Sequence, residues 1–343
     1  MWEQKTGEQV NGKSAAFAVN WKGAAVKNQI KIAAIQLNCD FADVKNNLSK
    51  AENFIRQAAA QKCELALLPE FFVSAIGFSP KMNDVALQGT SVRCALKTLS
   101  QELGIIIGGS FLILENGECY NTFDLVFPGG AIFSHKKDIP TQFENCYYTG
   151  GDTEHILHTP IGNVGVALCW EMIRADTLKR LIGKADFILA GSCWWDLPID
   201  APAEREPLRQ YNQSLALETP CVFAKRLHTP VVHANHCGRV TAYRFPSNDV
   251  RQTRQLVGAT QIVDCNGGVI QRKHFYEGEG IIIADIVTST STPDWVPVEY
   301  TDYWIPDLPQ SYQTAWQQLN PLGKLYYENT VRPFYRGALL QID

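Results

Sequence analysis

The sequence predicts a mixed α/β protein whose sheets are buried and whose helices pack outside them. Short apolar runs such as KIAAIQL at 31–37 alternate with segments of helical spacing such as 46–62. Hairpin signals lie among them, and the Asn116–Gly117 pair is the clearest. Of the 343 residues, 45% are hydrophobic and 19% are charged, which is typical of a globular protein.

The elements follow from these patterns in chain order. Apolar runs predict strands at 31–37, 64–72, 104–114, within 122–137, and at 164–170, 186–195, 230–238, 261–270 and 280–286. Helical spacing predicts helices at 46–62, 92–102, 176–185 and 204–228. Within the last helix, Pro220 predicts a break or a fresh start, because proline lacks the backbone N–H.

The composition divides the chain into three parts. Residues 1–29 are polar and contain Gly and Lys, so we expect an N-terminal extension before one domain at 30–287. Residues 288–343 are rich in Ser, Thr, Pro, Trp and Tyr, and cannot carry a sheet core alone. We expect this tail to wrap the domain or to contact a second subunit.

Charge and hydropathy exclude several classes of partner. The formal net charge is -4 and no basic block occurs, which argues against nucleic acid and against an anionic membrane surface. The first residues lack the basic start and apolar core of a secretory signal, and no apolar run is long enough to span a bilayer. We therefore expect a soluble, cytoplasmic protein.

Cysteine spacing argues against a disulfide framework and against a zinc site. The 10 cysteines are scattered without a CxxC pair. The segment HANHC offers His233, His236 and Cys237 as metal ligands, but no second ligand pair accompanies it. We expect no metal and no organic cofactor, and interpret this segment as the end of a strand near the pocket.

Residues suited to chemistry follow several of the predicted strands. Within ELALLPEFF, Pro69 stops the strand and Glu70 ends it, Lys137 follows a strand and precedes Glu144 by seven residues, and Cys169 ends VGVALC. The segment AGSCWWD, with Trp194 and Trp195, ends another strand. In α/β sheets, ligands bind at this edge. A lone buried Cys is more often a packing residue than a nucleophile, so the combination carries the interpretation.

The ordered segments PE at 69–70, HKKDIPTQFE at 135–144 and GVALCWE at 165–171 resemble the nitrilase, or carbon–nitrogen hydrolase, superfamily. The resemblance implies a single-domain αββα sandwich, often dimerised. It also implies a Glu–Lys–Cys triad of Glu70, Lys137 and Cys169, with Glu144 holding the lysine. Lys136 competes with Lys137, and the resemblance selects Lys137. The tail resembles in position the segments that reach across subunits, so we expect a homodimer or larger homo-oligomer.

The resemblance assigns chemistry to these residues. Cys169 would attack the carbon of a small amide, carbamoyl compound or nitrile, with Glu70 as general base. A position at a helix start would favour its thiolate. Lys137 and a backbone N–H after Cys169 would stabilise the developing charge. A thioester would form, ammonia or an amine would leave, and water would hydrolyse the thioester.

Neighbouring residues form the expected substrate site. Trp170 and Glu171 are expected beneath and beside the nucleophile, and Trp194 and Trp195 either wall the site or belong to the core. Cys146 and Cys193 are interpreted as bystanders, possible neighbours of the nucleophile in space.

Alternatives in function stay open at this stage. The segment MIRADTLKR after the nucleophile fits neither the nitrilase nor the amidase pattern, which leaves the substrate class open. Arg174 in it would either meet a substrate carboxylate or lie on a helix surface. A transferase would pass the thioester to an amine or acyl acceptor instead of water. A non-catalytic binding module would use the same pocket, although it would not require all four of the catalytic-type residues.

Overall fold

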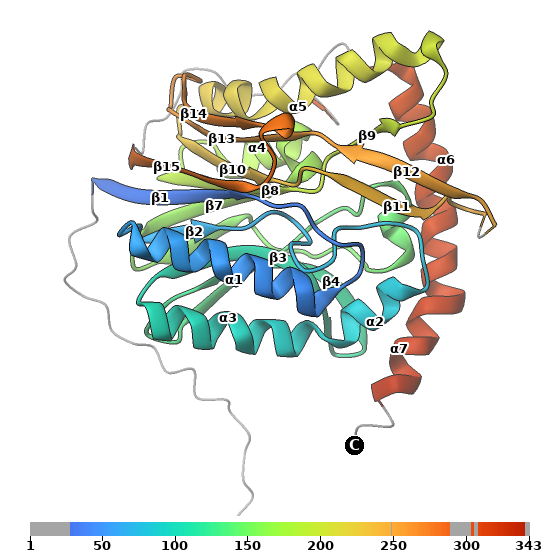
Figure 1. Cartoon of the computed structure of the whole chain (residues 1–343), viewed down its shortest axis with the longest axis horizontal. Helices are drawn as coiled ribbons and strands as arrows, with labels where there is room; N and C mark the ends of the chain where they lie inside the picture. Colours follow the sequence, from blue (N-terminus) through green and yellow to red (C-terminus); the bar gives the residue numbers. More distant parts are fainter. Residues whose placement is uncertain (1–27, 248, 289–302, 305–307, 340–343) are drawn as a thin grey trace, which may run out of the picture.

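The computed structural model describes residues 28–247, 249–288, 303–304 and 308–339. Two six-stranded sheets pack face to face at its centre (Figure 1). In spatial order, the first sheet consists of β15 (Gly280–Val287), β1 (Gln29–Gln36), β2 (Leu65–Leu67), β3 (Ile106–Glu115), β4 (Glu118–Val126) and β5 (Ile132–Lys136). The second consists of β14 (Val269–His274), β13 (Gly258–Val263), β10 (Val231–Asn235), β8 (Phe187–Ser192), β7 (Gly162–Leu168) and β6 (Ile156–Thr159).

Helices cover the outer face of each sheet (Figure 1). The first sheet carries α1 (Val44–Ala60) and α3 (Gly89–Leu103), and the second carries α4 (Ala175–Leu181) and α5 (Glu206–Leu227). A short helix, α2 (Lys81–Leu87), precedes α3. The expected four-layer αββα sandwich is confirmed.

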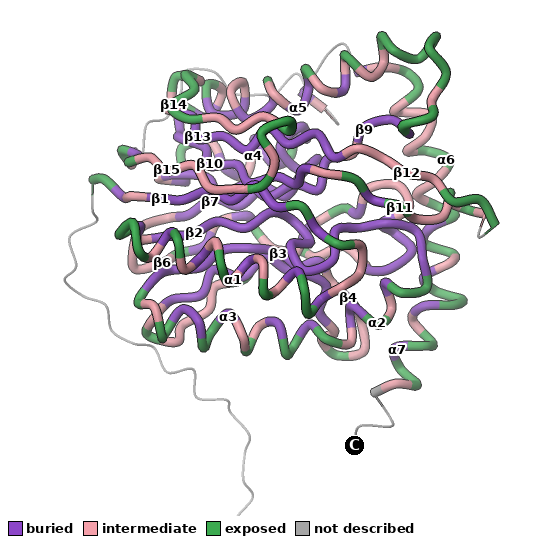
Figure 2. Tube along the Cα trace, in the orientation of Figure 1, coloured by how far each residue is buried: buried purple, intermediate pink, exposed green. Residues whose placement is uncertain are grey.

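The strand sequences explain why the layers hold together. Successive side chains of a strand point to opposite faces. In β1, Ile32 and Ala34 pack between the two sheets, whereas Ala33 and Ile35 pack on the helix side. Both faces of the central strands are therefore buried, as the buried colouring of Figure 2 shows, and their sequences read as continuous apolar runs.

Several predicted elements differ in the structure. Helix α5 continues through Pro220 without a break. The carbonyl of Leu217, in the turn before this proline, accepts hydrogen bonds from the side chains of Gln261 (2.9 Å) and Arg272 (3.4 Å). The predicted strand at 64–72 is only β2, and the run at 261–270 is the hairpin of β13 and β14.

The sequence did not predict a small third sheet. Its order is β11 (Arg239–Tyr243), β12 (Arg251–Leu256) and β9 (Trp195–Pro198). These strands are short and mostly polar, so they lack the apolar runs that mark the larger sheets. The register between β12 and β9 shifts between Arg254 and Leu256. Bulges of this kind re-aim side chains.

The C-terminal tail contains helices that the sequence analysis did not assign. Helix α6 (Gln310–Tyr326) continues through η5 (Tyr327–Val331) into α7 (Arg332–Leu339), and this long helical segment runs along one end of the sandwich (Figure 1). It packs on the turn η1 (Gln142–Cys146) of its own chain, where a Cβ added to Gly323 would lie 2.7 Å from Asn145. The predicted subunit contact of this tail stays a prediction.

The boundary of the predicted N-terminal extension moves slightly. Residues 1–27 lie outside the described part, but Gln29 already pairs with Val287 at the edge of the first sheet. Among the described helices, none is long and apolar enough to cross a bilayer.

Candidate active site

The four catalytic-type residues meet at one end of the sandwich because of where their elements stop. Glu70 lies three residues beyond the end of β2, and Lys137 directly follows β5. Cys169 directly follows β7, at the start of the turn η2 (Cys169–Ile173). Glu144 lies in η1. Both sheets thus present strand ends to the same place, as the sequence analysis expected of this edge.

Lys137 is fully buried between two carboxylates. Its Nζ lies 2.9 Å from Glu70 Oε1 and 2.8 Å from Glu144 Oε2. Burial alone lowers the pKa of Lys137, but Glu144 and Glu70 outweigh it, so this pKa is raised well above its ordinary value. Lys136 points elsewhere: its Nζ lies 2.8 Å from Glu115 and 3.9 Å above the ring of Tyr120. The strand alternation therefore brings only Lys137 into the cluster.

Glu70 has partners on both carboxylate oxygens. Asn121 Nδ2 donates to its Oε1 at 2.9 Å, and the backbone N–H of Cys193 donates to its Oε2 at 3.1 Å. Burial raises the pKa of Glu70 to about 7, a shift that Lys137 opposes and Glu144 reinforces. A carboxyl with this pKa can exchange protons near neutral pH.

Glu144 is held in the turn that carries it. The backbone N–H of Thr141 donates to Glu144 Oε2 at 3.0 Å, and the hydroxyl of Tyr148 donates to the same oxygen. With Lys137, this carboxylate oxygen therefore has three donors. Neither Tyr148 nor Asn121 was identified from the sequence, because Tyr148 follows Glu144 without a recognised role and Asn121 lies on β4, far from the motifs in the chain.

Cys169 occupies a strained backbone position. Its φ is 52°, in the left-handed region that non-glycine residues rarely adopt, and the residue is only 4% exposed. Burial and the negative charge of Glu70 raise the pKa of the thiol well above its ordinary value. The sequence predicted that a helix start would favour the thiolate; η2 is only a single short turn, and burial and Glu70 act in the opposite direction. The charges of Lys137 and Glu144 also act on it, so the four groups are close in space.

Cys169 opens on a small chamber of about 110 Å³. Three of the predicted pocket residues, Trp170, Trp194 and Trp195, contribute to its wall. The other lining residues are Thr141, Gln142, Phe143, Glu144, Cys193, Asp196, Leu197, Asn212, Arg254 and Tyr312. Trp195 stacks on Phe143 with ring centroids 4.5 Å apart, and the Trp194 ring N–H donates to Asn212 Oδ1 at 3.0 Å.

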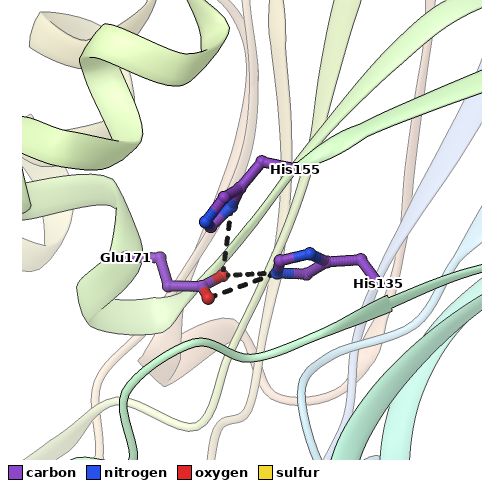
Figure 3. Close-up of side chains that lie close together, drawn as sticks. All are labelled: His135, His155 and Glu171. Atoms are coloured by element: carbon purple, nitrogen blue, oxygen red, sulfur yellow. Dashed lines mark hydrogen bonds and ion pairs between the residues drawn. The ribbon is translucent and has the colours of Figure 1, made fainter. Parts of the chain in front are cut away.

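Glu171 does not line this chamber. The expected place beside the substrate is not where the structure puts it, because consecutive side chains of the η2 turn point in different directions. Its carboxylate lies 3.0 Å from His135 Nε2 and 3.8 Å from His155 Nδ1 (Figure 3). It also accepts the backbone N–H groups of Leu168 (2.7 Å) and Asp138 (2.8 Å).

The group of His135, His155 and Glu171 resembles a metal-ligand set, since one ligand atom from each lies within 4.8 Å of the others. Hydrogen bonds account for the Glu171 carboxylate, His135 and His155 Nδ1, whereas His155 Nε2 has no hydrogen bond to a described residue and lies 3.6 Å from Asp138. Each Glu171 oxygen accepts a backbone N–H and also lies within hydrogen-bond distance of His135. His155 Nδ1 lies 2.9 Å from the Val166 carbonyl oxygen. Burial raises the pKa of Glu171, but His135 and His155 reverse this and hold it well below its ordinary value. We interpret the group as a buried support for the turn after the nucleophile.

The residues of HANHC also have protein partners. His233 Nε2 lies 2.8 Å from Ser192 Oγ, and His236 Nε2 lies 2.7 Å from the main-chain oxygen of Glu70. His236 thus supports the segment that carries Glu70. Arg174 fits neither of its two expected positions: it is buried outside the chamber, 4.5 Å from the ring of Trp316.

Two packed sheets with outer helices, and a buried Glu–Lys–Glu cluster beside a strand-end cysteine, define the nitrilase-type class of sandwich enzymes. The family model described as carbon–nitrogen hydrolase matches residues 31–293. The chain therefore belongs to the carbon–nitrogen hydrolase family, and the resemblance seen in the sequence is confirmed.

Curated relatives include both nitrilases and amidases. Nitrilase 1 of Arabidopsis thaliana is 26% identical over 305 residues, which cover 78% of this chain and 82% of that protein. N-carbamoylputrescine amidase of the same plant is 25% identical over 228 residues, covering 61% and 75%. Omega-amidase NIT2-B of Xenopus laevis is 31% identical over 152 residues, covering 40% and 54%.

Solved structures agree in fold. A carbon–nitrogen hydrolase from Helicobacter pylori G27 superposes with a TM-score of 0.64 at 18% identity, covering 76% of this chain and 89% of that one. An amidase from Nesterenkonia sp. AN1 superposes with a TM-score of 0.59 at 18% identity, covering 75% and 90%. These superpositions show that the fold is the one seen in those enzymes.

Proposed function

We propose that this enzyme hydrolyses the non-peptide C–N bond of a small amide, N-carbamoyl compound or nitrile through a thioester on Cys169. The observation that carries the proposal is the buried cluster of Glu70, Lys137 and Glu144 beside Cys169, with Glu144 and Cys169 in the wall of one chamber. The relatives support it, since they are named as amidases and nitrilases.

The first step is formation of the carbon–sulfur bond. Glu70, with its pKa raised to about 7, takes the thiol proton of Cys169 as the sulfur attacks the substrate carbon. Because burial and the charge of Glu70 favour the neutral thiol, the proposed step removes the proton as the sulfur attacks. With an amide, the carbonyl π electrons move to oxygen and give a tetrahedral intermediate.

Lys137 stabilises the negative oxygen of that intermediate. Its ammonium stays protonated between two carboxylates, so it supplies a fixed positive charge. The backbone N–H of Trp170 is a second donor, because the first N–H groups of a helical turn have no partner within the turn. Glu144 and Tyr148 fix the position of the lysine.

The nitrogen then leaves. The proton held by Glu70 passes to the departing nitrogen, the C–N bond breaks, and ammonia or an amine leaves the thioester behind. Water attacks the thioester carbon while Glu70 again accepts a proton, and the sulfur recovers that proton as the acid product forms. For a nitrile, the first adduct is a thioimidate, which takes up one water to release ammonia and give the same thioester.

Ammonia release from a panel of nitriles, primary amides, ω-amides and N-carbamoyl amines tests the proposal. We expect one class to react, with loss of at least about a thousandfold in Cys169→Ala and a similar loss in Lys137→Met. Cys94→Ala, which removes an exposed thiol on α3, serves as the control and retains full activity.

Two results would argue against hydrolysis. If ammonia appears only when hydroxylamine or another amine is added, the thioester serves a transferase. If no compound reacts and the folded protein resists alkylation at Cys169, the nucleophile assignment is wrong.

A further inference from the structure

The chamber beside Cys169 adjoins a second and larger cavity. The outer cavity measures about 500 Å³, against about 110 Å³ for the chamber. The two share the wall residues Gln142, Phe143, Trp195, Leu197, Arg254 and Tyr312. A substrate that has its reacting carbon at Cys169 and is too long for the chamber would pass these residues, and its far end would meet groups of the outer cavity.

Arg254 stands at the shared wall because of the irregular pairing of β12 with β9. Its guanidinium donates only to neutral acceptors. Nε and Nη2 donate to Gln252 Oε1 at 3.1 and 2.9 Å, and Nη1 donates to the main-chain oxygen of Asp196 at 3.3 Å. A guanidinium has five N–H donors, so this one keeps donors for a further acceptor.

Nearby carboxylates do not neutralise Arg254. The carboxylate of Asp196 lies 3.3 Å from Arg209 and accepts the Gln213 side-chain amide at 2.7 Å. Within the described ranges, no carboxylate lies within ion-pair distance of Arg254. The guanidinium is therefore a half-buried positive charge without a direct ion pair, and the charge of Asp196, which is shared with Arg209, only partly offsets its burial.

The outer cavity reinforces this positive charge. Arg205 and Arg244 also line it, and Asp200 is the one acidic residue among its described lining residues. Burial, together with the charge of Arg205, lowers the pKa of Arg254 to about 10, so the guanidinium remains protonated at neutral pH. A planar guanidinium with free N–H groups matches the geometry of a carboxylate.

We propose that Arg254 binds a carboxylate at the far end of the substrate, and that the enzyme therefore acts on amide or carbamoyl compounds bearing a terminal carboxylate. This inference rests on the proposed function for the reacting end. Arg205 and Arg244 attract the anion into the outer cavity, and a cationic far end is repelled. The competing interpretation is that Arg254 only ties β12 to β9 through Asp196.

A matched series of three amides separates these interpretations. Glutaramate, glutaramide and 5-aminopentanamide have similar lengths and end in an anionic, a neutral and a cationic group. We expect kcat/KM for ammonia release to favour glutaramate over glutaramide by about tenfold or more, with the cationic amide slowest. Calorimetric Kd values on the Cys169→Ala protein, which cannot turn them over, should follow the same order.

Variants assign the preference to Arg254. In Arg254→Gln the ratio of kcat/KM for glutaramate over glutaramide should fall to near unity. Arg254→Lys should retain part of this preference, because lysine keeps the positive charge but lacks the paired N–H donors of the guanidinium. Arg239→Gln changes an exposed arginine on the neighbouring strand β11 that lines neither cavity, and should keep the full preference. Arg205→Gln/Arg244→Gln, at exposed positions that the fold tolerates, should lower the preference a few-fold, most clearly at low salt.

The outcomes are decisive in both directions. Equal Kd and kcat/KM for glutaramate and glutaramide would overturn the inference. So would an Arg254→Gln protein that loses the same factor on all three amides, since that result marks a structural role. If no amide is hydrolysed but Cys169→Ala binds glutaramate in an Arg254-dependent manner, the anion site stands and the proposed hydrolysis fails.

Discussion

Trp316 of the C-terminal helix stacks on Trp170, the residue next to the nucleophile, with ring centroids 5.4 Å apart and planes 8° from parallel. Arg174 lies 4.5 Å from the same Trp316 ring. Four residues before Trp316, Tyr312 lines the chamber and donates its hydroxyl to Asn212 at 3.1 Å. The tail is therefore part of the wall of the site in its own chain.

Replacing Trp316 by Ala should weaken both the fold and the site. The stacked pair and the cation–π contact together account for about 2 kcal/mol of unfolding free energy. Because Tyr312 sits on the same helix, KM should rise more than kcat falls. Denaturant unfolding and steady-state kinetics measure the two effects. Trp316→Phe keeps an aromatic ring and should lose less than half as much unfolding free energy. If the Ala variant is as stable and as active as the parent, the Trp316 contacts do not contribute as stated.

The acid limb of the pH–rate profile should report Glu70. Its pKa is raised to about 7, and only the carboxylate can accept the thiol proton. Below that value kcat/KM should fall by about tenfold per pH unit. Protonation of Glu70 lowers activity without unfolding the protein. A carboxyl whose pKa is raised in the fold stabilises the folded state fully below its ordinary pKa of 4.5, and this stabilisation is lost as pH rises through about 7. Circular dichroism across the same range checks that point.

Glu144→Gln should move this limb to lower pH. The negative charge of Glu144 is one of the causes that raise the pKa of Glu70, and its removal also leaves Lys137 to Glu70 alone. The Gln side-chain oxygen can still accept from Tyr148 and Thr141, so the turn is retained. The measurement is kcat/KM from pH 5 to 9 for the parent and the variant. If the acid limb lies at the same pH in both proteins, a group other than Glu70 causes it.

Glu171 should support the site from behind. In Glu171→Gln, the buried histidines lose their carboxylate, at a cost of about 3 kcal/mol. The difference in unfolding free energy between the parent and the variant should be full above the ordinary Glu pKa of 4.5. It should shrink as pH falls below that value, because the pKa of Glu171 is held down in the fold. Burial alone lowers the pKa of His155, but Glu171 and Asp138 raise it above 6.5. As pH rises beyond the raised pKa, His155 loses its charge, so the difference in stability between parent and variant also shrinks there.

A kinetic readout separates positioning from stability in this variant. Glu171 accepts the N–H of Leu168, before the nucleophile, and the N–H of Asp138, after the lysine. kcat should therefore fall while KM changes little, at a temperature where the variant is folded. Glu102→Gln, which removes an exposed partner of Arg56, should change the stability little and leave kcat unchanged.

The sequence was sufficient where local pattern and short motifs carry the information. The apolar runs predicted the central strands of both large sheets, although not the edge strand β6, and the strand ends pointed to Glu70, Lys137 and Cys169. It was not sufficient for groups that reach the site from distant segments, such as Asn121 and Arg254, because tertiary contacts place them. Glu171 lies in a single helical turn, and consecutive side chains of such a turn point in different directions. The spacing of residues in the sequence does not show which of them faces the chamber.

Gly191 on β8 should be intolerant of a side chain because it lies against Glu70. A Cβ at this position would stand 2.9 Å from the backbone nitrogen of Glu70, and backbone cannot yield as a side chain does. Gly191→Ala should therefore destabilise the fold by about 1–3 kcal/mol and displace the general base. We expect kcat to fall with it, and the acid limb to shift as the contacts of Glu70 change.

Gly129→Ala is the matched control for that variant. An added Cβ there meets nothing within 4 Å and no positive φ is required, so the variant should be neutral or slightly more stable because the unfolded chain loses freedom. Thermal unfolding and kcat/KM are measured for both proteins. If Gly191→Ala behaves like Gly129→Ala, the two sheets do not fix Glu70 by close backbone contact, and the position of the base must come from Asn121, Lys137 and the N–H of Cys193 alone.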